Sequence, residues 1–170
     1  KTRPFARPLH WVAALFDGKA LEFEFDGIVS GMVSRGHRFL NPEKFKIKSL
    51  ESYLDECKKH SLIVDPEIRK KSILEQIQQL AKQAGGRIKE DEDLVNLVNY
   101  LVEYPVAIKG DFDSRFLELP QELLVITMKS HQKYFPIWDK KEKLLPCFIT
   151  VSNMPATDEN EIKKGNERVL

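Results

Sequence analysis

One segment constrains the fold more than any other: a helix with a strong start signal and a strong stop signal. Asp65-Pro66 opens it, because aspartate caps a first turn and proline suits the first helical position. Gly85-Gly86 ends it. Apolar residues at helical spacing predict a buried stripe of Ile68, Ile73, Leu74, Ile77, Leu80, Ala81 and Ala84. The basic residues Arg69, Lys70, Lys71 and Lys82 are expected in water.

The N-terminal third is predicted to be mainly extended. Residues 9–16 and 20–26, joined by Asp17-Gly18, are expected to form a hairpin, since Asp-Gly supplies the positive φ of a tight turn. Residues 27–39 continue as a third strand, in which Gly31 and Gly36 mark a bulge or bend.

The rest of the chain alternates helices with strands. Further helices are predicted at residues 49–60, 92–104 and 120–132, and further strands at 62–64, 105–110, 133–139 and 144–153. This order predicts an α+β fold with a mixed or antiparallel sheet and packed helices, as a single domain over residues 1–170.

Composition is that of a globular protein in a reducing compartment. Hydrophobic residues make up 42% and charged residues 31% of the 170 residues. No apolar run approaches the roughly 20 residues of a membrane helix. Cys57 and Cys147 are expected to be free thiols in the cytoplasm, with Cys147 a small core residue of its strand, and a disulfide or zinc site is the minority alternative.

Charge is distributed unevenly along the chain. Although the net charge is only +1, residues 35–48 hold five basic residues against Glu43 alone, a net +4. Residues 90–122 hold nine acids against two basic residues, a net −7. The acidic stretch is interpreted as a solvated surface, whereas the basic stretch is either a solvated surface or a positive binding face.

The sequence predicts no catalytic or metal residues. His10, His37, His60 and His131 lie on different elements in no metal-binding spacing, and the chain has no phosphate loop or nucleophile elbow. Two acids, Asp111 and Asp113, form a candidate dyad, but at this spacing in a turn they are expected to cap the next helix.

Basic residues interleaved with aromatic residues are the candidate RNA contacts, because Arg and Lys neutralise phosphates while aromatic and guanidinium planes stack on unpaired bases. The candidates are Arg35, His37 and Arg38 beside Phe39; Lys129, His131 and Lys133 beside Tyr134 and Phe135; and Arg168. Strand alternation would place Arg35 and His37 on one face and Arg38 on the other, with Phe39 anchoring the turn. The alternative is structural: the aromatic rings are core, and the basic groups bind turn carbonyls.

The chain begins without methionine and stops within a predicted charged helix, which is expected of a piece of a longer protein. Five segments, in order and spanning almost the whole chain, resemble the beta subunit of the bacterial heterotetrameric glycyl-tRNA synthetase: residues 7–19, 30–42, 101–112, 116–139 and 165–170. The resemblance implies a B3/4-type synthetase domain. It also implies that the phosphohydrolase-like and anticodon-binding regions lie further along such a subunit, outside this chain.

The resemblance also implies a function and partners. Glycine activation with ATP and Mg is expected on a separate alpha subunit, so no cofactor is expected in this fragment. The expected partners are glycine tRNA, the alpha subunit and the remaining beta-subunit domains, with no membrane. The chain is then a tRNA-contacting or scaffolding part of a glycine–tRNA ligase. Two rivals remain: an editing deacylase acting on mischarged tRNA, and a purely structural module.

Overall fold

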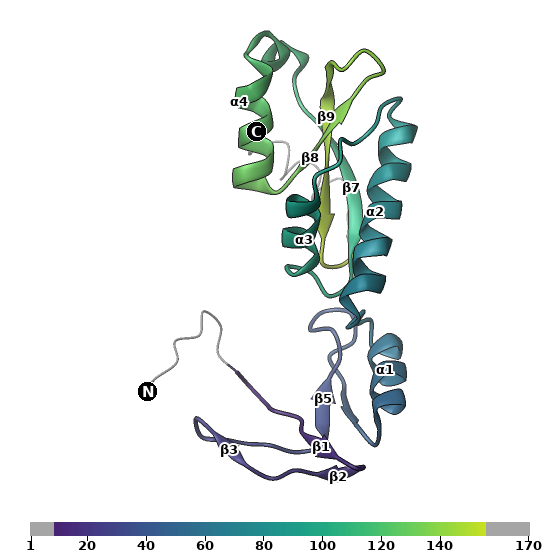
Figure 1. The fold of residues 1–170 in the computed structure, drawn as a ribbon, viewed down its shortest axis with the longest axis vertical. Helices are drawn as coiled ribbons and strands as arrows, with labels where there is room; N and C mark the ends of the chain where they lie inside the picture. The colour runs from purple at the N-terminus through teal and green to yellow at the C-terminus, as the bar shows by residue number, and fades with distance from the viewer. Residues whose placement is uncertain (1–8, 156–170) are drawn as a thin grey trace. The chain divides into compact units, whose positions relative to one another are not determined.

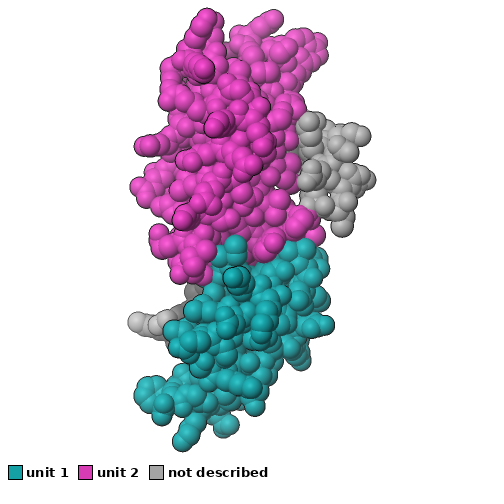
Figure 2. Space-filling view, turned by 90° about the vertical axis from the view of Figure 1, so that its right-hand side faces the viewer, with its two compact units in different colours: residues 1–64 teal, residues 65–170 magenta. Residues whose placement is uncertain are grey.

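The computed structural model describes residues 9–155, which fall into two compact units on either side of the Val64–Asp65 bond (Figure 2). The N-terminal unit combines one helix, and the C-terminal unit several, with antiparallel strand pairs, so the predicted α+β class is confirmed. The expectation of a single domain over residues 1–170 stays a prediction, because compact units can still unfold together.

Two short antiparallel hairpins form the first part of the N-terminal unit (Figure 1): β1 (Leu15–Phe16) with β2 (Lys19–Ala20), and β3 (Glu24–Phe25) with β4 (Ile28–Val29). The Asp17-Gly18 turn has φ values of 49° and 71°, as predicted from its sequence. Asp26-Gly27 makes a second such turn, with 51° and 78°. The predicted strand 20–26 is not continuous, because Ala20 pairs in the first hairpin, Glu24 and Phe25 pair in the second, and residues 21–23 form no strand.

A third strand pair and one helix complete the N-terminal unit. They are β5 (Val33–Arg35), β6 (Lys44–Lys46) and α1 (Leu50–Lys59). The helix begins where predicted, because the Ser49 hydroxyl accepts the Ser52 amide N–H at 3.1 Å and the Ser52 hydroxyl accepts that of Ser49 at 2.8 Å. Phe45, Ile47 and Cys57 form the small core. Residues 62–64 are half-buried but form no strand, which corrects that prediction.

The C-terminal unit is a three-stranded antiparallel sheet with helices on both faces (Figure 1). Its strands, in spatial order, are β7 (Val106–Asp111), β9 (Leu144–Ser152) and β8 (Phe135–Trp138). One face carries α2 (Pro66–Gln83) and α3 (Glu92–Asn99); the other carries α4 (Gln121–Ile126) and the π-helix η2 (Thr127–Gln132). Alternating residues of β9 build both cores, since Cys147 faces α2 and Phe148 faces η2. Cys147 is buried in the core, as predicted.

Side-chain placement on α2 differs from the predicted stripe at two positions. Ile68, expected in the core, is 60% exposed, and Arg69, expected in water, is 8% exposed. The Arg69 Nε–H donates to the Asn99 carbonyl at 2.9 Å and to its side-chain oxygen at 3.0 Å. The guanidinium is buried because the last turn of α3 needs donors for its free carbonyls. The helix that was predicted over residues 92–104 is shorter than expected and ends at Asn99.

Of the two acids, only Asp113 caps a helix. Asp113 caps the 3-10 helix η1 (Ser114–Glu118), because its carboxylate accepts the Arg115 amide N–H at 2.9 Å. This confirms the capping prediction for Asp113, and Asp111 ends β7. Within residues 9–155, no helix is long and apolar enough to cross a membrane.

Candidate functional site

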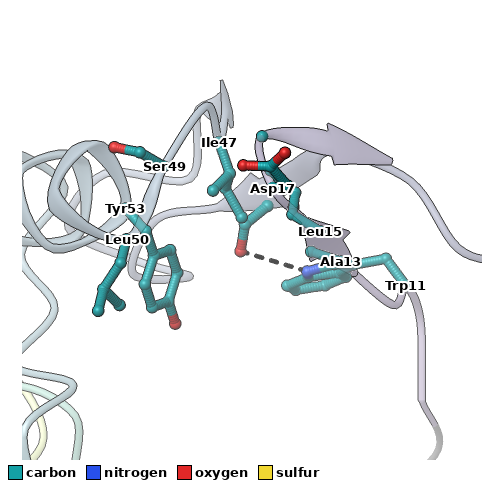
Figure 3. A pocket seen from close by; sticks show the side chains of 10 residues that line it. Trp11, Ala13, Leu15, Asp17, Ile47, Ser49, Leu50 and Tyr53 are labelled. Carbon is teal, nitrogen blue, oxygen red and sulfur yellow. Dashed lines mark hydrogen bonds between the residues drawn. The ribbon is translucent and has the colours of Figure 1, made fainter. Parts of the chain in front are cut away.

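Trp11 is fixed beside strand β5 by backbone pairing that joins residues far apart in the chain. Ala14 N–H donates to the Gly31 carbonyl, and Gly31 N–H donates to that of Val12, both at 3.0 Å. The Trp11 indole N–H then donates to the Ser34 hydroxyl at 3.4 Å, drawn as a dashed line in Figure 3. Trp11 stays 43% exposed. An accessible indole is therefore held in a defined position on the surface of this unit.

Two arginines of the predicted RNA-contact set lie beside exposed aromatic rings. The Arg35 guanidinium carbon is 5.7 Å from the Trp11 ring centroid, and that of Arg38 is 5.4 Å from the Phe39 centroid. Neither arginine forms an ion pair within residues 9–155. Both line an open surface hollow, which we call the arginine hollow: His10, Trp11, Arg35, Gly36, Arg38 and Pro42. Trp11 was not among the predicted site residues.

His37 is buried and Phe39 is exposed, which is the reverse of the prediction. His37 is 1% exposed, and its Nδ1 accepts the backbone N–H of Phe39 at 3.3 Å and of Leu40 at 3.2 Å. Phe39, expected to anchor the turn in the core, is 67% exposed. His37 is thus the anchor of the turn. Its burial leaves no surface for an RNA contact in this conformation.

Gly36 explains why strand alternation fails here. Strand β5 ends at Arg35, so Arg35 is exposed while His37 points inward, and the prediction that they share a face is wrong. A Cβ at Gly36 would lie 2.1 Å from the Asn41 carbonyl oxygen and 2.6 Å from the His60 Cβ. Only glycine allows this close approach of the chain to itself.

The β5–β6 pair carries the positive charge on its outer face. Arg35 lies directly opposite Lys44, and Val33 lies opposite Lys46. These four residues are exposed, whereas Phe45 between the two lysines is buried. Strand alternation therefore gathers three cations on one surface beside the arginine hollow, which makes that surface electropositive.

A second hollow of about 580 Å³ shares Trp11 with the first, and we call it the Trp–Tyr hollow (Figure 3). It is lined by Trp11, Ala13, Leu15, Asp17, Gly18, Ser34, Ile47, Ser49, Leu50 and Tyr53. The rings of Trp11 and Tyr53 both face this hollow. Burial raises the pKa of Tyr53 to about 12, so its hydroxyl is neutral at physiological pH. Apart from Tyr53, Asp17 is the only acidic or basic side chain among the described residues that line this hollow.

In the C-terminal unit, Lys129 is engaged in a structural contact. Its ammonium group lies 2.6 Å from the Asp91 carboxylate, which also caps α3 by accepting the Leu94 N–H at 3.0 Å. Burial alone would raise the pKa of Asp91, but the hydrogen bonds from Lys129 and the Leu94 amide outweigh it and lower that pKa.

The other predicted residues of this segment divide between surface and core. His131 is exposed, and the Lys133 ammonium group donates to the Ser130 carbonyl. Tyr134 and Phe135 are buried, as the structural alternative predicts. Arg168 lies outside the described residues. Within residues 9–155, no group of three or more His, Cys, Asp or Glu side chains is arranged to hold a metal ion.

Comparison with known proteins places the chain among aminoacyl-tRNA synthetase subunits. The family described as the glycyl-tRNA synthetase beta subunit matches residues 1–170. The chain is 50% identical to the glycine–tRNA ligase beta subunit of Geobacter sp. strain M21, 49% to that of Geobacter sulfurreducens and 48% to that of Syntrophus aciditrophicus. Each similarity covers 166 residues, which is 98% of this chain and 24% of the relative. The chain therefore belongs to the glycyl-tRNA synthetase beta-subunit family, which confirms the predicted resemblance, and it spans about a quarter of the length of these relatives.

Proposed function

We propose that this chain is the part of a glycine–tRNA ligase beta subunit that holds the tRNA backbone at Arg35 and Arg38. The observation that carries the proposal is the pair of exposed arginines without ion pairs among residues 9–155, next to Lys44 and Lys46, in a chain of this family. Guanidinium groups bind phosphates through fixed donor forks, and unpaired cations give the strongest contribution.

The proposal places catalysis elsewhere in the enzyme. Glycine activation with ATP and Mg²⁺ would occur on an alpha subunit of a cytoplasmic heterotetramer, with the remaining beta-subunit domains as further partners. The match to a beta-subunit family supports this division of labour, because a beta subunit implies a separate alpha subunit. The alternative, a purely structural module, is supported by the contacts that His37, Lys129 and Arg69 make within the fold.

An editing deacylase is a weaker proposal. Hydrolysis of a mischarged tRNA requires an activated water beside the ester. Among the described residues that line the two hollows, Asp17 is the only carboxylate, and it lies in the Trp–Tyr hollow, away from the two arginines. Glycine is also the smallest amino acid, so a tight synthetic site excludes larger ones by size, and the need for editing is weak.

The test uses the whole enzyme, with both subunits. We expect Arg35→Ala and Arg38→Ala each to weaken tRNA binding and to reduce the salt slope of the affinity by about one unit or less. Melting temperature and formation of glycyl-adenylate should stay unchanged. Lys71→Ala is the control, because Lys71 is an exposed cation outside the basic stretch. Unchanged tRNA affinity in both arginine variants, with lost stability, would refute the RNA contact.

A further inference from the structure

We propose that the two hollows that share Trp11 together hold one unpaired nucleotide. Its base enters the Trp–Tyr hollow, and its phosphate lies on Arg35 and Arg38 in the arginine hollow. This inference rests on the proposed function and deepens it, because it names the part of the RNA that is bound: a single-stranded nucleotide with its base turned out of any helical stack.

Charge separates the two parts of the nucleotide. Among the described residues, two guanidinium groups and no acid line the arginine hollow, which suits a phosphate. Asp17 gives the Trp–Tyr hollow a negative charge, and none of the described residues that line it is Lys or Arg. A phosphate is repelled from that hollow, whereas a base is not. A nucleotide that spans both hollows therefore has a single favourable orientation, with its phosphate on the arginine side of Trp11 and its base on the Tyr53 side.

The walls of the Trp–Tyr hollow suit a planar base. Leu15, Ile47 and Leu50 supply apolar surface, while Trp11 and Tyr53 supply aromatic rings (Figure 3). Single-strand binding proteins combine base–aromatic stacking with cations that hold the backbone, and the stacking tolerates any base. A volume of about 580 Å³ lies within the usual range of small-molecule sites and admits a base with its sugar.

Trp11 is prepared for this contact before any ligand arrives. Its indole N–H is bound to Ser34, and Arg35 lies against the ring. A ring held in place loses little conformational freedom on binding. In a duplex, the faces of the bases are covered by their neighbours, so the ring has access only to an unpaired base.

Asp17 predicts which bases are preferred. A carboxylate only accepts hydrogen bonds, so it favours cytosine, whose exocyclic amino group carries two N–H donors, over uracil, whose single N3–H lies between two carbonyl oxygens that the carboxylate repels. Asp17→Asn is a matched test, because Asp17 has φ 49° in the turn and asparagine adopts this conformation equally well. The substitution removes the charge and keeps the turn residue type, so the preference for oligocytidine over oligouridine should fall in this variant.

The experiment measures binding of short labelled RNAs to the whole enzyme. The probes are unstructured oligocytidine, oligouridine of equal length and a blunt duplex. We expect oligocytidine to bind more tightly than the other two, and to quench tryptophan fluorescence. Trp11→Leu should weaken oligocytidine binding about 5- to 150-fold, the usual effect of losing one stacked base. Trp11→Phe should retain most of the binding but lose the quenching, which separates stacking from misfolding.

The outcomes distinguish this inference from the proposed function. Equal binding of oligocytidine and oligouridine, or binding unaffected by Trp11→Leu, overturns the placement of the base. If the base placement fails in this way but tRNA affinity still falls in Arg35→Ala, the proposed contact with the tRNA backbone remains valid. If neither Arg35→Ala nor Arg38→Ala changes tRNA affinity, the proposed function itself is wrong, and the inference falls with it.

Discussion

Replacing His37 tests whether this buried ring is the anchor of the turn that presents Arg38 and Phe39. His37→Leu removes the acceptor while roughly keeping the apolar volume, so the amide N–H groups of Phe39 and Leu40 lose their partner. A neutral hydrogen bond contributes about 0.5–1.5 kcal/mol, so two together contribute about 2 kcal/mol. Since 1.4 kcal/mol corresponds to a factor of ten, the turn should open about 30-fold more often.

Amide hydrogen exchange in the whole beta subunit measures this opening directly at the two affected groups. His37→Asn is the matched control, because its side-chain oxygen occupies the position of Nδ1 and accepts the same amides. We expect fast exchange at Phe39 and Leu40 in the leucine variant and near-parental exchange in the asparagine variant. Equal exchange in all three proteins would show that His37 does not hold the turn.

Two further predictions concern the C-terminal unit. Arg69→Met leaves the Asn99 carbonyl without its charged donor, a loss of about 1.5–3 kcal/mol. Amide hydrogens of α3 should therefore exchange about 10- to 100-fold faster. Lys71→Met, at an exposed position, is the control and should leave these exchange rates unchanged. Because the folded-state pKa of Asp91 is lowered, its contribution to stability is complete above the unfolded pKa near 3.8 and is lost as pH falls through the folded value. Melting temperature should therefore fall less steeply with acid in Lys129→Met than in the parent, and identical slopes would contradict this account.

Local signals in the sequence correctly predicted where several elements begin and turn. Ser49 and Asp65 cap α1 and α2, and Asp17-Gly18 makes a hairpin turn. These features depend on groups within a few residues of one another, so the chain specifies them without knowledge of the rest of the fold. Asp26-Gly27 carried the same signal, and weighing it equally would have found the second hairpin.

The sequence by itself determined the fold class, the family and the positive stretch that holds Arg35 and Arg38, because these are properties of local patterns and of their order. Only the tertiary structure decided which side chains form the site. Trp11 lies beside Arg35, which is 24 positions further along the chain, and Arg69 donates to Asn99, which is 30 positions further along. Gly36 turns His37 inward and leaves Phe39 exposed, reversing the order that strand alternation predicts. Burial is decided by partners distant in the chain, and no local pattern contains them.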